Sequence, residues 1–573
     1  MRINRIFLRA QPVGRRISWA DLIVIAGLIA VIFGLIELSR IAPHVISAPK
    51  ISTDPRDLPL YAVFSTTRMF LAYILSLIFT FVYGSLAASS KQRERVLLPI
   101  LDILQSVPIL AYLPMVVMAL TAILPLGIAK EFSAVLLIFT SQAWNMTFSW
   151  YQSLTTTPRE LKEASSIFQL SPWMRFTTLS FPFSAIGLIW NSVMSWAGGW
   201  FALMAAEMFH TANRQFELPG LGSYIQQAAN DSNYRAIFWG IATLVVVIVL
   251  LDQCMWRPLL AWADKFRLDM VSSEMPASSW VYDAFSTASV IRRFRRKVVR
   301  PAARAFDQKM RSMFPPRLEF HQELKPIHHN RPIQVILIVA MSFLLFASFR
   351  FMANVSFHDW GLIALGLLAT TFRVFLALTI SVAWTIPVGY AIASDSKISK
   401  YLQPLTQLAA SIPATALYPL FLVGLLRVRG GLEIAAMLLM LSGTQWYVLF
   451  NVIAGARAIP QDLKYTAQLM GLSGWEKWKT FILPALFPFI ATGAITAAGG
   501  AWNASIFAEY TQFGGGKYST AYGIGAIVSG SQNASNYPLL MASTLTMVLA
   551  VIIINRLVWK RIYATAEERF RLE

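Results

Sequence analysis

Two stretches decide the fold of this chain: residues 158–182, PRELKEASSIFQLSPWMRFTTLSFP, and residues 460–484, PQDLKYTAQLMGLSGWEKWKTFILP. Each is a polar, helix-forming segment between long apolar runs, and each ends in a proline that opens the next run. Residues 158–207 share 13 of 50 positions with residues 460–509 at an offset of 302. Because self-similarity at a fixed offset marks an internal repeat, the chain is predicted to contain two copies of one unit.

The composition is typical of a protein that crosses a membrane several times. Of the 573 residues, 56% are hydrophobic and 14% are charged, and the mean hydropathy is +0.54, whereas soluble domains carry about 25% charged residues. The net charge of +20 is interpreted as Lys and Arg collected in cytoplasmic loops, and nucleic-acid binding is not expected. The single cysteine, Cys254, excludes a disulfide framework and a Cys-based metal site, and it is expected to be a packing residue.

Twelve apolar runs are long enough to cross about 30 Å of hydrocarbon as helices. The first run follows a basic segment, is too long for a signal-peptide core and lacks a small-residue cleavage site, so it is predicted to be retained. Each half has six runs and begins on the same side, which predicts an all-α membrane protein of about 12 transmembrane helices in two parallel repeats. The runs lie near residues 19–41, 66–88, 103–124, 132–151, 180–206 and 236–256, and near residues 333–352, 362–393, 405–426, 431–453, 483–507 and 538–558.

The loops between these runs alternate in charge, which predicts their orientation. Loops rich in Lys and Arg stay in the cytoplasm, so both termini are predicted to be cytoplasmic. The opposite loops carry fewer Lys and Arg and much Gly, Pro, Asn and Ser. The basic loops are residues 91–95, 155–175, 257–331, 397–400 and 457–479 and the tail from residue 556.

The repeat extends beyond the two cytoplasmic stretches. At an offset of 305, residues 99–114 match residues 404–419 with all three prolines in register, and Arg68 matches Arg373. Two parallel halves enclose a path between them. This arrangement fits either an ATP-driven permease or an ion-coupled secondary transporter, and the latter should place unpaired Asp, Glu or His deep in its spans.

The segment between the halves is strongly basic. Residues 257–331 contain 15 Lys or Arg and 7 Asp or Glu. We interpret it as a linker and topological anchor that lies on anionic lipid, with a docking or regulatory segment as the alternative. Three histidines lie there without Cys or convergent carboxylates, so no metal site is predicted: His321, His328 and His329.

The two cytoplasmic stretches resemble the coupling motif of permease subunits in bacterial ATP-binding-cassette (ABC) importers. That motif is Glu-Ala-Ala, a few residues, Gly, and a longer spacer to Leu-Pro. The first copy retains Glu163 and Ala164 but has Gln169 in place of the glycine, whereas the second retains Gly471 and has Tyr465 in place of the glutamate. The resemblance covers about residues 60–260 and 362–562. The segment WFALMAAEMF at residues 200–209 is similar to the nitrate, sulfonate and taurine class.

This resemblance implies an architecture and partners. Each half would contain a five-helix type I importer core, in a fused permease for a small anion such as nitrate, a sulfonate, taurine or bicarbonate. The chain would be no enzyme and hold no cofactor, since ATP and Mg would bind a separate ABC ATPase dimer, and an extracytoplasmic binding protein would deliver substrate in the bacterial inner membrane. The expected parts are a tail and first span (1–60), a permease domain (61–260), a basic linker (261–331), an extra span (332–361), a second permease domain (362–562) and a tail (563–573).

A glycine-rich segment at residues 514–517 superficially suggests a nucleotide site. Tyr518 follows Lys517 where a phosphate loop has Ser or Thr, and the upstream glycine spacing is wrong. The segment is therefore predicted to be a flexible loop, and no catalytic residue is expected in this chain.

Candidate site residues fall into two groups. Those expected to contact the ATPase are Glu163, Ala164, Leu170, Trp173, Leu463, Gly471, Leu472 and Trp475. Those expected along the translocation path or its outer gate are Gly198, Trp200, Glu207, Gly500, Trp502, Asn503 and Glu509. The alternative for the second group is that the tryptophans anchor the helices at the membrane–water interface and that each glutamate is a polar residue at a helix end. The side chains of Arg68 and Arg373 are expected to snorkel towards water rather than to contact substrate.

Overall fold

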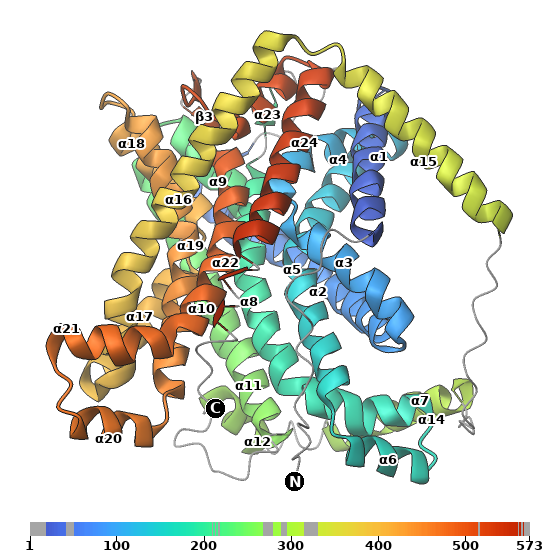
Figure 1. The fold of residues 1–573 in the computed structure, drawn as a ribbon, viewed down its shortest axis with the longest axis vertical. Coiled ribbons are helices and arrows are strands. Elements are labelled where there is room, and N and C mark those ends of the chain that lie inside the picture. The colour runs from blue at the N-terminus through green and yellow to red at the C-terminus, as the bar shows by residue number, and fades with distance from the viewer. Residues whose placement is uncertain are drawn as a thin grey trace, which may run out of the picture.

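The computed structural model describes residues 19–41, 51–208, 210–211, 214–215, 218–266, 279–287, 295–314, 331–513, 516–559, 561–562 and 565–566. Within these ranges the chain is almost entirely helical (Figure 1). The largest group of buried apolar residues draws on both halves of the chain.

The first half runs from α1 to α11. Its elements are α1 (Trp19–Ile41), η1 (Pro55–Asp57), α2 (Leu58–Ala88), α3 (Lys91–Ser106), α4 (Ile109–Ile123), α5 (Leu126–Thr156), α6 (Arg159–Ile167), α7 (Pro172–Arg175), η2 (Phe176–Ser180), α8 (Phe181–Glu207), β1 (His210–Thr211), β2 (Arg214–Gln215), α9 (Leu221–Asn230), α10 (Tyr234–Leu251), η3 (Asp252–Trp256) and α11 (Arg257–Ala263).

The connecting segment and the second half follow. The connecting segment contains η4 (Asp264–Phe266), α12 (Trp280–Thr287), η5 (Arg295–Val299) and α14 (Arg300–Met313). The second half contains α15 (Arg331–Met352), α16 (Phe357–Ser394), α17 (Ser396–Ser411), α18 (Ala414–Leu425), α19 (Gly431–Ala458), α20 (Gln461–Leu469), α21 (Gly474–Lys477), η6 (Trp478–Ile482), α22 (Leu483–Glu509), β3 (Tyr510–Phe513), β4 (Gly516–Ser519), α23 (Ile524–Asn533), α24 (Tyr537–Ile554) and η7 (Asn555–Trp559).

Each of the twelve predicted apolar runs coincides with a helix or with a pair of helices. In the described part of the chain, seven helices are long and apolar enough to span a membrane, and an eighth span is possible if α17 and α18 act as one. Shorter apolar helices occupy residues 23–38 and 339–352, within α1 and α15. The prediction of an all-α, duplicated membrane protein is confirmed.

Two predicted spans are broken rather than continuous. The run near 405–426 is the pair α17 and α18, bent by 83°, and the run near 103–124 is the pair α3 and α4. Pro413 and Pro108 stand at the two breaks, and the preceding Ile412 and Val107 have extended backbones with ψ of 118° and 124°. A proline disfavours helical geometry in the residue before it, so both breaks follow from the same duplicated sequence.

Equivalent helices of the two halves each pack on the opposite half. Helix α4 packs on α22 and α23, and its counterpart α18 packs on α8 and α9. The additional first helices depart from this symmetry, because α1 packs on α3 and α4 whereas α15 packs on α1 and α24. The repeat therefore covers the inner helices and not the two added ones.

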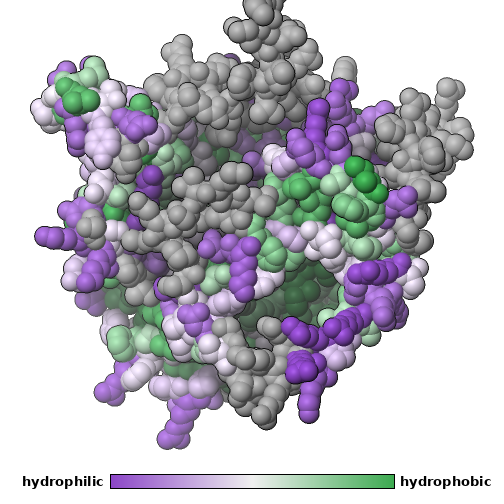
Figure 2. All heavy atoms as spheres, turned by 90° about the horizontal axis from the view of Figure 1, so that it is seen from below, coloured by the Kyte–Doolittle hydropathy of each residue, from purple (hydrophilic) through white to green (hydrophobic). Residues whose placement is uncertain are grey.

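The ends of the bundle differ in character. The motif helices α6, α7, α20 and α21 lie at the lower end of Figure 1, and β3 and α23 lie at the upper end. Seen from below, hydrophilic side chains surround a hollow whose visible wall is hydrophobic (Figure 2). The prediction of a flexible loop is wrong for Gly516 and Lys517, which pair with β3 as part of β4, while residues 514–515 lie outside the described ranges. The prediction that Cys254 is a packing residue is also wrong, because its side chain is exposed.

Candidate coupling surface and outer ion-pair clusters

The two coupling segments have the same backbone geometry. Helix α6 ends in a left-handed turn at Gln169, with φ of 48°, and α20 ends in the same turn at Gly471, with φ of 67°. In both, the residue after the turn donates its N–H back to the helix, from Leu170 to the carbonyl of Ser165 and from Leu472 to that of Ala467, at 3.1 Å. This is the Schellman arrangement, in which glycine avoids the strain that a side chain meets at positive φ.

Large apolar side chains stand exposed at matching places just before each turn. In the first copy Ile167 and Phe168 are 77% and 75% exposed, and in the second Leu469 and Met470 are 88% and 70% exposed. Both pairs lie at the C-terminal ends of α6 and α20, and these helices lie at the lower end of the bundle (Figure 1). The candidates named from the sequence include none of these four residues, although the offset of 302 relates each pair to the other.

The residues expected to contact the ATPase divide by exposure. Glu163 and Trp475 are exposed, as is Leu463, whereas Ala164, Leu170, Trp173 and Leu472 are half-buried. Trp173 is less exposed than its counterpart Trp475, because α14 packs on α7. The structure thus brings these residues to one end of the bundle and leaves the two tryptophans in different surroundings.

At the other end of the bundle, Arg68 of α2 forms a buried ion-pair cluster. Its Nη1 donates to Glu207 Oε1 at 2.8 Å, and its Nε donates to Glu131 Oε2 at 2.6 Å. The Glu207 carboxylate also accepts from the Ser65 hydroxyl at 2.7 Å and from the backbone N–H of Gly222 at 2.8 Å. The side chain of Arg68 is 4% exposed and that of Glu207 is 0% exposed, so the cluster fastens α2, α5, α8 and the start of α9.

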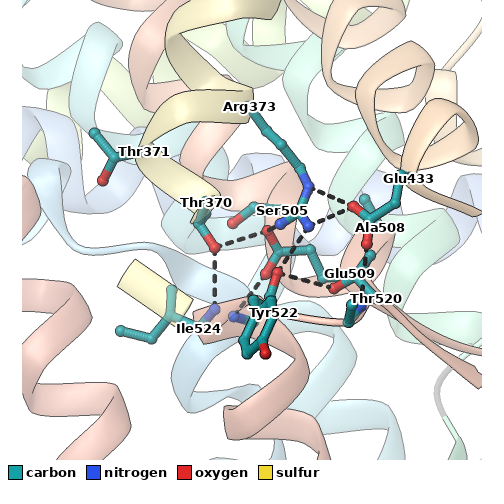
Figure 3. Close-up of polar contacts among 12 residues, drawn as sticks. Thr370, Thr371, Arg373, Glu433, Ser505, Ala508, Glu509, Thr520, Tyr522 and Ile524 are labelled. Carbon is teal, nitrogen blue, oxygen red and sulfur yellow. Dashed lines mark hydrogen bonds and ion pairs between the residues drawn. The ribbon is translucent and has the colours of Figure 1, made fainter. Parts of the chain in front are cut away.

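The second half repeats this cluster around Arg373 (Figure 3). Arg373 Nη1 donates to Glu509 Oε1 at 2.8 Å, and its Nε donates to Glu433 Oε2 at 2.8 Å. Thr370 donates its hydroxyl to Glu509 at 2.7 Å, and the N–H of Gly525 donates to the same carboxylate at 2.9 Å. Every member has its partner in the first cluster at an offset of 302 to 305.

These clusters correct the prediction that Arg68 and Arg373 snorkel. Each guanidinium group pairs with one fully buried glutamate and with a second that is partly exposed, and such pairing is how charges are tolerated within membrane spans. Sequence reasoning missed Glu131 and Glu433 as partners. A duplicated Arg and a duplicated Glu near the same end of neighbouring spans are the pattern that identifies such pairs.

The remaining path candidates lie along α8 and α22. Trp200 and Trp502 are buried, at 1% and 3% exposure. A Cβ placed on Gly198 would lie 3.8 Å from Tyr447 Oη of the opposite half, and one on Gly500 would lie 3.7 Å from the Tyr447 ring. Tyr447 therefore lies between the two glycine positions. Asn503 donates its side-chain amide to the carbonyl of Gly499 at 3.1 Å.

No metal site is formed by the residues that the structure describes. Among those residues, no group of three or more His, Cys, Asp or Glu side chains is placed to hold a metal ion. The histidines at residues 321, 328 and 329 lie outside the described ranges.

Both halves of the chain match one known protein family. The model of the family described as "Binding-protein-dependent transport system inner membrane component" matches residues 80–255 and again residues 385–571. The chain belongs to this family. It contains two copies of the family's domain, which makes it a multi-pass ABC-type permease of the inner membrane.

Several curated relatives of this permease are named for the transport of bicarbonate, nitrate or taurine. It is 30% identical over 147 residues to the bicarbonate transport system permease protein CmpB of Synechococcus elongatus, covering 26% of this chain and 51% of the relative. It is 27% identical to the nitrate import permease protein NrtB of Synechocystis (26% and 53% covered) and 29% identical to the taurine transport system permease protein TauC of Escherichia coli (25% and 50% covered). The permease thus spans about half the length of the curated relatives it matches.

Proposed function

We propose that this chain supplies both transmembrane halves of an ATP-driven importer for a small anion. A separate ATPase dimer docks on α6–α7 and α20–α21, and an extracytoplasmic binding protein delivers the substrate to the opposite end. Both termini then lie in the cytoplasm. The observation that carries the proposal is the matched pair of exposed apolar side chains, Ile167–Phe168 and Leu469–Met470.

Exposed side chains of this kind need a partner. Burial of a large apolar side chain contributes about 1.5–3 kcal/mol, so four of them left in water at the polar end of the bundle are costly. A short helix with an apolar face fits the helix-in-groove mode of protein recognition. Two copies in equivalent positions fit a partner that is itself a dimer.

The ion-pair clusters are not expected to bind the substrate. Each cluster holds one Arg and two Glu, and Glu207 and Glu509 are fully buried. Their carboxylates face Arg, a hydroxyl and a backbone N–H rather than open space, so they support the outer end of the path rather than bind an anion. The class of substrate is proposed from the relatives, whose names concern bicarbonate, nitrate and taurine.

Co-purification with an ATPase from a neighbouring gene tests this function. One chain should bind two ATPase subunits, and native mass measurement gives that ratio. Proteoliposomes with the ATPase and binding protein should then accumulate one of bicarbonate, nitrate or taurine in an ATP-dependent manner. Two chains per ATPase dimer would contradict the fused arrangement, and uptake without ATPase would favour a secondary transporter.

A further inference from the structure

Helix α14 of the connecting segment lies against the first coupling segment. The indole Nε1 of Trp173 donates a hydrogen bond to Asp307 Oδ1 at 2.8 Å. The ring of Phe306 meets the Trp173 ring edge-on, with centroids 5.7 Å apart. At the equivalent place in the second segment, Trp475 is 73% exposed. The two coupling segments therefore differ in what surrounds their tryptophan.

Asp307 is itself fixed in this contact. Its Oδ2 accepts from Arg311 Nε at 2.8 Å, one turn along α14. Trp173 also stacks on Phe176 of its own segment, at 5.7 Å and 23°. Trp173 is therefore held by Asp307 on one side and by Phe176 on the other. The bond to Asp307 is the stronger kind, because hydrogen bonds to a charged acceptor are stronger than neutral ones.

The coupling helices that carry these tryptophans are too short to be stable alone. Helix α7 spans Pro172–Arg175 and α21 spans Gly474–Lys477, four residues each, and isolated helices of this length do not form in water. Helix α7 begins with Pro172, whose ring fixes φ. Helix α21 begins with Gly474, which has φ of 53°, and glycine is conformationally permissive. Sequence and contacts both make the first segment the stiffer one.

We propose that Asp307 is a positioning residue for the coupling surface: through Trp173, α14 holds the first coupling segment in a fixed position, while the second adjusts when the ATPase binds. The proposal rests on the proposed function, because it concerns how that same surface meets the ATPase. It assigns a role to the basic connecting segment other than a lipid anchor. The ATPase dimer then meets one preformed site and one adaptable site.

Hydrogen exchange on the whole chain in lipid nanodiscs, without ATPase, tests the contact. Amides of residues 159–176 should exchange about tenfold more slowly than those of residues 461–478, the factor that a hydrogen bond to a charged group confers. Asp307→Ala should remove that difference, and Asp307→Asn should restore part of it, because the Asn side-chain oxygen still accepts the indole N–H but carries no charge. Trp173→Phe, which keeps an aromatic ring and removes the donor, should match Asp307→Ala, and the double variant should lose no more than either.

Controls separate this contact from general damage and from failure of the proposed function. Lys309→Ala, at an exposed position of the same helix, should leave exchange unchanged. With the ATPase added, Asp307→Ala should weaken its apparent affinity for the chain severalfold and leave the maximal ATPase rate unchanged, and Asp307→Asn should restore part of the affinity. Unchanged exchange in Asp307→Ala and Trp173→Phe would overturn the proposal. If exchange responds but the wild-type chain binds no ATPase, the proposed function fails and the coupling role of Asp307 fails with it.

Discussion

Arg68 and Glu207 lie 139 residues apart in the chain and are joined by a hydrogen bond of 2.8 Å inside the bundle. Arg373 and Glu509, 136 residues apart, form the same bond at 2.8 Å. Gene duplication thus preserved a long-range ion pair as well as the local motif, and the pair holds together the ends of α2 and α8, and of α16 and α22, that lie away from the coupling segments. The clusters and the coupling segments stand at opposite ends of the same helices.

Breaking one ion pair should destabilise its half of the protein. Arg68→Ala leaves Glu207 buried without its main partner, which costs about 3–5 kcal/mol. The double variant Arg68→Met with Glu207→Leu removes both charges and should cost less than the single change. Thermal unfolding in detergent measures the difference. The double variant unfolding below Arg68→Ala would contradict this account of the pair.

Space around the clusters should be as important as charge. A Cβ on Gly220 would lie 2.3 Å from the Glu207 carboxylate, and one on Gly523 would lie 2.4 Å from Glu509 Oε2. Gly220→Ala and Gly523→Ala should therefore lower the unfolding temperature as strongly as loss of the arginine. Gly127→Ala, where the added Cβ meets nothing within 4 Å, is the matched control and should leave that temperature nearly unchanged.

The left-handed turns should respond in opposite directions to exchanged residues. Gln169→Gly relieves a positive-φ side chain, and Gly471→Gln introduces one; such strain costs about 1–3 kcal/mol. A Cβ at Gly471 meets nothing within 4 Å, so strain alone should act there. Hydrogen exchange of each segment should slow in Gln169→Gly and quicken in Gly471→Gln. The same direction of change in both variants would show that the turns are not equivalent.

The exposed apolar residues before each turn should govern ATPase binding and not folding. Replacing Ile167 and Phe168 with Ser should weaken ATPase binding by at least tenfold, since burial of each contributes about 1.5–3 kcal/mol. Replacing Leu469 and Met470 should do the same, with an unchanged unfolding temperature in both cases. The control is Ile123→Ser, which changes an apolar residue at the end of α4, outside both coupling segments, that is 65% exposed. Full ATPase affinity in both Ser variants would remove these residues from the docking surface.

The sequence by itself determined the class, the duplication and the position of the coupling motif. These rest on local properties, since the length of apolar runs is set by the thickness of the bilayer. The breaks at Pro108 and Pro413 also have a local cause, although continuous spans were predicted there from the sequence. The motif glycine at Gly471 is visible in the sequence as well, and the structure places it in a left-handed turn with φ of 67°.

Only the tertiary structure decided which charges pair and what covers Trp173. Arg68 was interpreted as a snorkelling residue because its position near a span end is compatible with water, and its partners come from α5 and α8, far along the chain. The contact of Asp307 with Trp173 spans 134 residues and breaks the repeat, so no comparison of the two halves could reveal it. Pairing over such distances depends on how helices pack, whereas the sequence alone shows only which charges recur in both halves.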